Sequence, residues 1–277
     1  MPDTRDRYAV FGNPIAHSKS PFIHARFAEQ TGQYIEYTAE LVEPGDFENA
    51  VARFADGNGK GLNVTVPFKQ DAWRLATQRS ARAERAGAVN TLVINGAGDY
   101  YGDNTDGVGL VRDLVSNHGL DLDGRRILII GAGGAVRGVI EPLMACKPAC
   151  LIIANRTREK ALQLADDFSD LGNISGCGLD EFGPDSYDVI INATSASLSG
   201  ELPELPATLI DRATFCYDMM YAAEPTPFMQ WARQHGAERV VDGKGMLVEQ
   251  AAESFRLWRN CEPETAPVID ALRELRQ

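Results

Sequence analysis

The segment from Arg126 to Ile130 (RILII) runs directly into a glycine-rich loop, GAGGAVRG, and this junction constrains the fold more than any other feature of the chain. Consecutive apolar residues without polar alternation fit a strand that is buried on both faces, as in a parallel sheet covered by helices. A helical stretch follows the loop, and a second apolar run, Leu151 to Ala154, follows that helix. Strand, glycine loop, helix and strand in this order predict a doubly wound α/β domain.

Further elements of this domain are predicted on both sides of the junction. Short strands are expected at Asp188 to Ile191, Phe215 to Tyr217 and Arg239 to Val241. Upstream, three valines recur at helical spacing and predict a helix that ends at Gly119, with one side lined by Val108, Val111 and Val115. The whole series is typical of a Rossmann-like nucleotide-binding domain.

The first hundred residues show a second α/β series. Strand patterns occur at Tyr8 to Phe11, Ile35 to Leu41, Leu62 to Val66 and Val89 to Ile94. The dipeptide Asn95-Gly96 after the last of these predicts a hairpin. One helix is expected to start with Ser20 as N-cap and Pro21 as first residue and to end at Gly32. Another is predicted where Phe47, Val51 and Phe54 share a face.

The chain ends in two helical stretches, Gly245 to Asn260 and Thr265 to Leu275, which have no strand of their own. They need an apolar surface to cover, so we expect them to pack back on the first domain. The predicted fold is α/β with two α/β domains. Residues 1–106 and 245–277 form a substrate-binding and catalytic domain, and residues 107–244 form the Rossmann-like domain.

Composition narrows the class of partner. A formal net charge of −12 and a pI near 4.8 disfavour nucleic acid and anionic membranes, because both require a basic face. No apolar stretch approaches the ~18 residues of a membrane span, and the N-terminal apolar run is too short for a secretory signal. We expect a cytoplasmic protein, either a monomer or a homodimer, that acts on a small molecule.

The cysteines and histidines give no support to a metal site. The five cysteines show no C-x-x-C spacing and lie mostly in apolar stretches, as buried free thiols do. The four histidines are scattered along the chain. We therefore expect no bound metal.

The loop GAGGAVRG is a candidate phosphate site. Gly131 and Gly133 stand where a dinucleotide-binding loop needs a tight turn and a close approach to a pyrophosphate, and Gly134 and Ala135 open the helix that follows. The third position of the G-x-G-x-x-G pattern is Val136 instead of Gly or Ala, so the loop also fits a simple packing turn.

The residues after the second buried strand indicate which cofactor is bound. An NAD site carries an acidic residue at this strand end to hold the ribose hydroxyls. Here the strand is followed by Asn155, Arg156 and Thr157, with Lys160 close by. A guanidinium binds a 2′-phosphate through two hydrogen bonds whereas a carboxylate repels it, so the pattern favours NADP(H). The alternative is an ordinary solvated first turn that Thr157 caps.

Polar clusters in the first domain are candidates for a substrate site. Ser18 and Ser20 lie at a predicted helix start, which suits a carboxylate, although Ser20 also fits a cap with no other role. Lys69 follows the strand in NVTVPFK, and strand ends commonly supply catalytic groups. Asn90 lies in AVNT, and Asp106 lies in GDNTDG at the domain junction, where a cleft between domains would open.

Eight motifs together resemble the shikimate dehydrogenase family, in order and over nearly the whole chain: SKSP, NVTVPFK, AVNT, GDNTDG, GAGGAVRG, NRTREK, NATS and GMLVEQAAESFRLW. The resemblance implies the reversible reduction of 3-dehydroshikimate to shikimate with NADPH, in the shikimate pathway of aromatic amino acid biosynthesis. Two positions depart from the family pattern. Ala25 follows His24 where the family usually has Asn, and Tyr221-Ala222-Ala223 lacks the usual proline; neither position is among the reacting groups.

The resemblance also implies roles for individual residues. The catalytic pair would be Lys69 and Asp106. The substrate carboxylate would be bound by Ser18, Ser20 and Tyr221, and the ring hydroxyls by Asn63, Thr65, Lys69, Asn90, Asp106 and Gln250. The cofactor pyrophosphate would lie on Gly131, Gly133, Gly134 and Ala135, and the 2′-phosphate on Asn155, Arg156, Thr157 and Lys160. The nicotinamide end would face Thr194, Ser195, Met219 and Gly243.

Hydride transfer requires one proton to be managed by the protein. In the reducing direction a protonated Lys69 would give its proton to the carbonyl oxygen, and a neighbouring Asp106 would favour the charged lysine. Three alternatives stay open. They are a quinate/shikimate dehydrogenase with broader substrate or NAD use, a non-catalytic regulator that binds NADP or shikimate-like acids, and a folate-linked dehydrogenase of related architecture.

Overall fold

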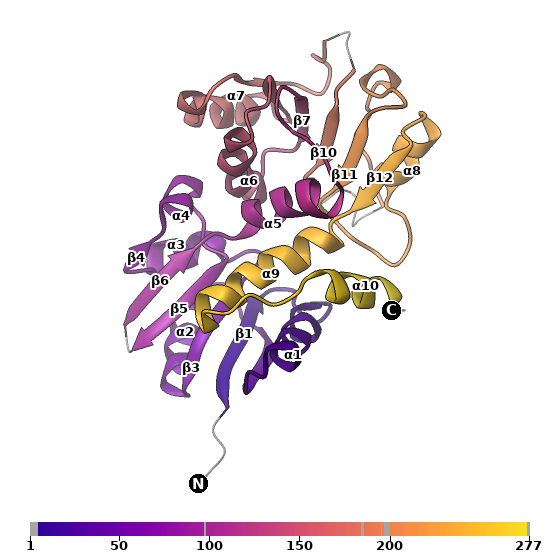
Figure 1. Ribbon diagram of the computed structural model, residues 1–277. Coiled ribbons are helices and arrows are strands. Elements are labelled where there is room, and N and C mark those ends of the chain that lie inside the picture. The colour runs from indigo at the N-terminus through magenta and orange to yellow at the C-terminus, as the bar shows by residue number, and fades with distance from the viewer. Residues whose placement is uncertain (1–4, 97, 184–185, 195, 197–199, 276–277) are drawn as a thin grey trace. The chain divides into compact units, whose positions relative to one another are not determined.

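The computed structural model describes residues 5–96, 98–183, 186–194, 196 and 200–275 (Figure 1). These residues form two compact units. The first unit runs to Gly109 and takes up the chain again at Leu247–Glu274, and the second unit is Leu110–Met246. Each unit contains one six-stranded sheet, so both are α/β.

The sheet of the first unit is mixed, with the strand order β2-β1-β3-β5-β6-β4. Its strands are β1 (Asp6–Gly12), β2 (Ile35–Leu41), β3 (Gly59–Val64), β4 (Gln78–Arg79), β5 (Thr91–Gly96) and β6 (Asp99–Asp103). The first three strands in the order are parallel, whereas β5 is antiparallel to both β3 and β6. The antiparallel pairing of β5 with β6 confirms the predicted hairpin, with Asn95 and Gly96 as the last two residues of β5.

Helices cover this sheet with the apolar faces that the sequence contains. They are α1 (Ser20–Thr31), α2 (Phe47–Asp56), α3 (Lys69–Leu75), α4 (Ala81–Ala86), the part of α9 (Lys244–Arg259) from Leu247 onward and α10 (Ala266–Glu274). Phe47, Val51 and Phe54 are all buried in one cluster with residues of β1, β3 and β5, as predicted.

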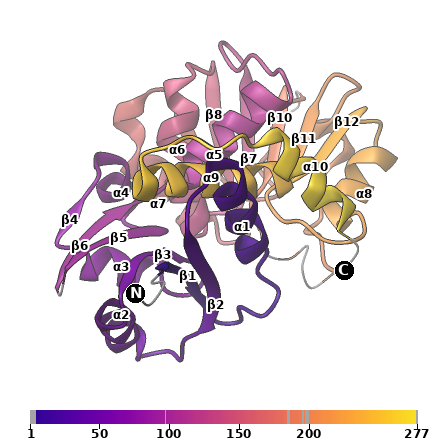
Figure 2. The same ribbon diagram turned by 60° about the horizontal axis from the view of Figure 1, so that its bottom comes forward.

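The two C-terminal helices pack back on the first unit, which confirms the expectation from the sequence. Val248 and Phe255 of α9 and Val268 of α10 form one apolar cluster with Ile23 and Phe27 of α1. In both views α10 lies beside α1 (Figures 1 and 2). The C-terminal segment is therefore part of the first unit, although it is distant in sequence.

The starts of α1 and β5 are among the boundaries in the first unit that differ from the prediction. Lys19, not Ser20, is the N-cap of α1, so Ser20 is the first helical residue and Pro21 the second. Gly32 ends the helix as predicted, in the left-handed conformation (φ 63°) that glycine adopts easily. The strand expected from Val89 begins at Thr91. Val89 donates its backbone N–H to the Lys69 oxygen, whereas Asn90 donates to Asp103 and accepts from Val64.

The sheet of the second unit is entirely parallel, with the strand order β12-β11-β10-β7-β8-β9. Its strands are β7 (Arg126–Ile130), β8 (Cys150–Ala154), β9 (Ile174–Cys177), β10 (Val189–Asn192), β11 (Phe215–Asp218) and β12 (Arg239–Asp242). Counted along the chain this is the order 3-2-1-4-5-6 of a doubly wound dinucleotide fold. The order reverses between β7 and β10, so ligands are expected at the carboxyl ends of these two strands.

Helices lie on both faces of this sheet, as the apolar strands require. They are α6 (Gly134–Ala145), α7 (Arg158–Asp167) and α8 (Pro227–Gln234). Ile127 and Ile129 of β7 belong to one buried cluster, and Leu128 and Ile130 belong to another. A strand whose alternate residues enter two separate cores must be covered on both sides, which confirms the interpretation of RILII.

The helix predicted before β7 is present, and its leucines are more deeply buried than its valines. It consists of α5 (Asp106–Arg112) continued by a π-helical turn at Asp113–Asn117. Its buried residues include Leu110 and Leu114, whereas Val115 is 40% exposed. Both the valines and the leucines recur at helical spacing, and the larger leucines bury more apolar area, so they face the core. Strand β9 was also missed, because its four residues include Gly176 and are only partly buried.

Candidate active site

Lys69 and Asp106 meet in the first unit, although 37 residues separate them in sequence. Lys69 is the first residue of α3 and Asp106 the first residue of α5, and each follows the end of a sheet strand. The Lys69 Nζ atom lies 2.5 Å from Asp106 Oδ2. The lysine side chain is 20% exposed and the aspartate side chain 9%, so the pair is shielded but reachable from solvent.

The Asn90 amide holds the other side of the aspartate. Its Oδ1 accepts hydrogen bonds from the Thr105 backbone N–H at 2.9 Å and from the Thr91 hydroxyl at 2.9 Å. A backbone N–H can only donate, so the amide orientation is fixed. The Nδ2 group therefore donates to Asp106 Oδ1, at 2.8 Å. Asp106 thus receives one donor on each carboxylate oxygen.

Asn63, in β3, is the centre of a second set of buried hydrogen bonds. Its Oδ1 accepts from the Tyr37 hydroxyl at 2.7 Å and lies 3.2 Å from His24 Nε2. Its Nδ2 group donates to Ser254 Oγ at 3.0 Å and to the Asn90 backbone oxygen at 3.3 Å. Every hydrogen-bonding atom of the Asn63 side chain thus has a partner within the first unit.

The protonation states in this set follow from burial. Burial lowers the pKa of His24 to about 3, so the ring is neutral and donates through Nε2 to Asn63 Oδ1. Among the described residues His24 Nδ1 is then buried without a hydrogen-bond partner. Burial raises the pKa of Tyr37 well above its usual value, so its hydroxyl remains a donor. The Tyr37 and His24 rings stack at 4.1 Å.

The other residues of the first unit that were predicted to bind substrate have different partners. Gln250 of α9 accepts a hydrogen bond from Asn90 Nδ2 at 3.3 Å, so it joins the Lys69–Asp106 cluster. Ser18 accepts a hydrogen bond from the Ser20 backbone N–H at 3.3 Å at the start of α1, and the Ser20 side chain is hydrogen-bonded to Tyr37. Thr65 is half-buried just after β3.

Several residues of this network were not singled out from the sequence. Thr91 and Thr105 lie inside the motifs AVNT and GDNTDG, so a polar residue beside Asn90 and Asp106 was a usable signal. Ser254 is fully buried and bonds to Thr91 at 2.7 Å across 163 residues of sequence. Ser254 also lies inside a motif, GMLVEQAAESFRLW, but its partner comes from a distant strand; Tyr37 lies in none of the motifs.

In the second unit the glycine loop lies at the switch point of the sheet. Gly131 has φ +117°, and a Cβ there would lie 3.2 Å from the Ala193 carbonyl carbon, so only glycine fits. A Cβ on Gly133 or Gly134 would meet nothing within 4 Å. Open space in front of a helix N-terminus is what a pyrophosphate needs, so these residues fit a dinucleotide. Val136 is fully buried, which explains why an apolar residue replaces the third glycine.

The cationic residues after β8 differ in whether an acidic side chain already forms an ion pair with them. Arg158 is engaged with Glu181 at 2.7 Å. Arg156 is exposed and forms no hydrogen bond or ion pair with any residue that the structure describes. The Asn155 side chain donates to the Thr157 backbone oxygen at 2.9 Å and shapes the turn, and Lys160 is exposed in the first helical turn of α7. Arg156 and Lys160 are thus the cations that fit a 2′-phosphate.

The residues predicted at the nicotinamide end follow three adjacent strands. Thr194 comes after β10, Met219 after β11 and Gly243 after β12. Ser195 lies outside the described residues. Tyr221 is partly buried two residues beyond Met219, and burial raises the pKa of its hydroxyl. These positions share the carboxyl edge of the sheet with the glycine loop.

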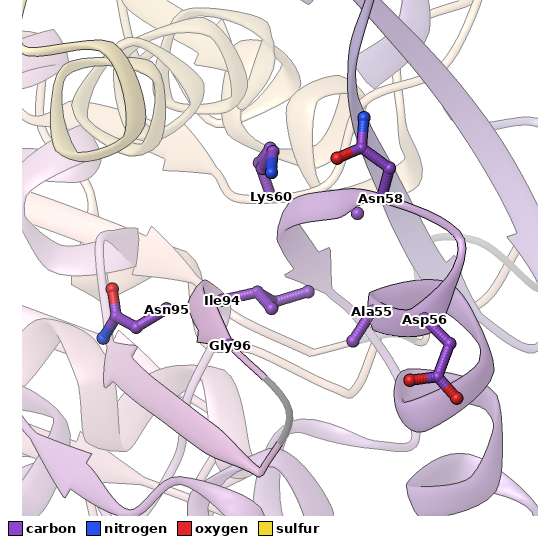
Figure 3. A pocket seen from close by; sticks show the side chains of 8 residues that line it. Ala55, Asp56, Asn58, Lys60, Ile94, Asn95 and Gly96 are labelled. Atoms are coloured by element: carbon purple, nitrogen blue, oxygen red, sulfur yellow. The ribbon is translucent and has the colours of Figure 1, made fainter. Parts of the chain in front are cut away.

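Other features of the surface do not coincide with the predicted site. A depression in the first unit is lined by Ala55, Asp56, Asn58, Gly59, Lys60, Ile94, Asn95 and Gly96 (Figure 3). None of these residues is among the predicted site residues. Within the described ranges no cluster of three or more His, Cys, Asp or Glu side chains could hold a metal ion. None of the described helices is both long and apolar enough to cross a membrane.

The fold and the site together define a class of α/β protein. Its members contain a Rossmann-type unit and a second unit that carries a lysine–aspartate pair. Three family models match: the shikimate dehydrogenase substrate binding domain over residues 10–92, shikimate/quinate 5-dehydrogenase over 113–199, and the shikimate 5′-dehydrogenase C-terminal domain over 243–273. The chain is 57% identical over 272 residues to "Shikimate dehydrogenase (NADP(+))" of Methylococcus capsulatus, covering 98% of each chain. The chain belongs to the shikimate dehydrogenase family.

Solved structures agree with this assignment. An Ael1 enzyme from Pseudomonas putida is 45% identical, with a TM-score of 0.91 over 96% of this chain and 98% of that chain. Shikimate 5-dehydrogenase from Thermus thermophilus, in complex with NADP(H) and shikimate, is 30% identical, with a TM-score of 0.85 over 96% of this chain and 98% of that chain.

Proposed function

We propose that this chain reduces 3-dehydroshikimate to shikimate with NADPH, reversibly, as its named relatives do. The relative from Methylococcus capsulatus carries the activity in its name, and the neighbour from Thermus thermophilus holds both NADP(H) and shikimate. The observation that carries the proposal is the Lys69–Asp106 pair, held on its other side by Asn90.

The pair supplies what a carbonyl reduction needs from the protein. When bound, NADPH provides the hydride for the carbonyl carbon. Lys69, protonated and next to the Asp106 carboxylate, donates a proton from Nζ to the carbonyl oxygen, which becomes the hydroxyl of the product. The ammonium is then restored by a proton from water. Asp106 holds and directs the Lys69 side chain through the ion pair between Nζ and Oδ2.

We assign the remaining roles to the predicted residues in the same proposal. Ser18, Ser20 and Tyr221 bind the substrate carboxylate, and Asn63, Thr65, Asn90 and Gln250 orient the ring hydroxyls. Gly131 to Ala135 bind the pyrophosphate. Asn155, Arg156, Thr157 and Lys160 bind the 2′-phosphate, and Thr194, Ser195, Met219 and Gly243 bind the nicotinamide end. The substrate domain comprises residues 1–106 and 245–277, and the cofactor domain comprises 107–244.

We also propose the cellular setting. The net charge of −12 supports a protein that works without nucleic acid or an anionic membrane as partner. It acts in the cytoplasm as a monomer or a homodimer. Light scattering on the purified protein distinguishes the two oligomeric states, and a species larger than a dimer would contradict this part of the proposal.

The proposed activity is tested by offering purified protein 3-dehydroshikimate with NADPH, and shikimate or quinate with NADP⁺ or NAD⁺. We expect rapid NADPH consumption with 3-dehydroshikimate and much faster oxidation of shikimate than of quinate, with NADP⁺ preferred. Comparable turnover of quinate, or of NAD⁺, would favour the broader quinate/shikimate activity. No turnover of any pair, with the nucleotide still bound, would favour a regulator.

A further inference from the structure

Asp218, the last residue of β11, is a fully buried carboxylate in the second unit. Its Oδ1 accepts hydrogen bonds from Asn192 Nδ2 at 3.0 Å and from the Met220 backbone N–H at 2.9 Å. Its Oδ2 accepts the Thr226 hydroxyl at 2.6 Å. A buried carboxylate is costly unless donors surround it, and here both oxygens of Asp218 accept hydrogen bonds.

The Asp218 carboxylate determines the position of Thr194 through the side chain of Asn192. Because Asn192 Nδ2 donates to Asp218, the amide oxygen must point the other way, toward the loop after β10. There Oδ1 accepts the Thr194 hydroxyl at 2.8 Å and the Thr194 backbone N–H at 3.3 Å. The side chain and backbone of Thr194 are therefore held by Asn192, which is itself held by its hydrogen bond to Asp218.

The same carboxylate fixes the loop after β11. Its bond to the Met220 N–H orients the chain just beyond Met219, whose own N–H donates to the Asn192 backbone oxygen at 2.8 Å. Gly243 follows β12 and donates its N–H to the Met220 oxygen at 3.2 Å. A Cβ on Gly243 would lie 2.3 Å from the Met219 oxygen, so this backbone packs directly against Met219.

Thr226 connects Asp218 to helix α8. Its hydroxyl donates to Asp218 and also accepts the Met229 backbone N–H at 3.3 Å, as the N-cap of α8. The positive end of this helix therefore faces the buried carboxylate and stabilises its charge. Asp218 is thus anchored by a rigid element on one side and bonded to the loops at the sheet edge on the other.

We propose that Asp218 is a positioning residue for the nicotinamide half of the cofactor. Thr194, Met219 and Gly243 form the nicotinamide end in the proposed function, on which this inference rests, and each connects to Asp218 directly or through one residue. Asp218 is fully buried, so it acts through those three residues and does not touch the reacting atoms. Residues that bind the adenosine half follow β7 and β8, outside this set of hydrogen bonds.

If Asp218 positions the nicotinamide half, its loss should raise the dissociation constant of one nucleotide and not that of another. Binding measurements show this difference without turnover. NADPH carries the nicotinamide, whereas adenosine 2′,5′-bisphosphate carries only the adenosine half. In Asp218→Ala we expect the dissociation constant of NADPH to rise about tenfold or more, since at least one ordered contact is lost. The dissociation constant of adenosine 2′,5′-bisphosphate should stay unchanged. Calorimetry on the full-length variants gives both values.

Two further variants separate positioning from folding. Asp218→Asn keeps an oxygen for Asn192 and Met220 and places an N–H toward the Thr226 hydroxyl, so it should restore most of the NADPH affinity. Tyr217→Phe, next in the same strand, removes a different buried hydrogen bond, from the Tyr217 hydroxyl to Asp113 at 2.6 Å. It should lower the thermal midpoint while leaving both dissociation constants unchanged.

Each alternative outcome has a definite meaning. Equal weakening of both nucleotides in Asp218→Ala would show a general loss of the second unit, and no weakening of either would show that Asp218 has no positioning role; both results overturn the inference. Loss of NADPH affinity in Tyr217→Phe as large as in Asp218→Ala would do the same. Wild-type protein that binds neither nucleotide would instead overturn the proposed function itself.

Discussion

Asp106 holds Lys69 Nζ at 2.5 Å on one carboxylate oxygen and Asn90 Nδ2 at 2.8 Å on the other. The two donors differ in kind, because the amide is fixed by the Thr105 backbone whereas the lysine is the terminus of a flexible side chain. The aspartate is therefore held in place by Asn90 and in turn directs the lysine.

Asp106→Asn keeps the size of the side chain but removes the charge next to Lys69. We expect kcat for 3-dehydroshikimate reduction to fall about a hundredfold, because Lys69 loses the ion-pair partner that orients its ammonium group toward the substrate. Steady-state kinetics and NADPH titration check this. A variant with normal kcat would show that the carboxylate is not needed.

Arg156→Asp places a carboxylate where the 2′-phosphate is expected. The dissociation constant of NADP⁺ should rise about 10- to 100-fold, the effect of losing charge-assisted hydrogen bonds, while that of NAD⁺ changes little. Arg158→Ala is the matched control, since Arg158 is already paired with Glu181 and its loss should affect neither nucleotide strongly. Equal weakening of both nucleotides in Arg156→Asp would contradict the assignment.

Two glycines of the same loop should respond differently to alanine. Gly131→Ala forces a side chain into a left-handed backbone against Ala193, so the free energy of unfolding should fall by about 1 to 3 kcal/mol. Gly133→Ala meets open space and should leave that free energy within about 0.5 kcal/mol of wild type. Its NADPH affinity should nevertheless fall about tenfold, since the methyl group occupies the expected pyrophosphate position.

Urea unfolding and NADPH titration of both glycine variants test this contrast. Gly133→Ala with unchanged NADPH affinity would remove the pyrophosphate from this loop. Gly131→Ala with wild-type stability would show that the backbone there relaxes without strain.

His24 should make stability depend on pH. Its folded-state pKa, about 3, lies below its usual 6.5, so the unfolded chain binds more protons between these values. The contribution is complete above pH 6.5 and is lost progressively as the pH falls toward 3. Between pH 8 and pH 5 wild type should lose about 2 kcal/mol more than His24→Gln, whose side chain does not titrate. Urea unfolding at the two pH values measures this, and equal losses would contradict a neutral buried His24.

Sequence patterns predicted the elements whose conformation depends mainly on residues close together in the chain. RILII followed by a glycine loop predicted the strand, turn and helix at the switch point, because continuous apolar strands and positive-φ glycines have few alternatives. The convergence of Lys69 and Asp106 was expected only from the resemblance, since neither motif reveals which strand ends are neighbours.

The parts that sequence patterns missed depend on contacts between distant elements. The helix with Val108 and Leu110 carries two apolar sides at the same spacing, and only packing decides which one is buried. Ser254 and Asp218 look like ordinary polar residues until the sheets place Thr91 and Asn192 beside them. Buried polar networks of this kind have no periodic signature.

The most direct test of the account compares wild type with Lys69→Ala in NADPH consumption on adding 3-dehydroshikimate. We predict that kcat falls by about 10² to 10⁴, the usual effect of removing a positioned acid, while the dissociation constant of NADPH stays near the wild-type value. Turnover by Lys69→Ala within a few-fold of wild type would contradict the account, because the proton would then come from another group.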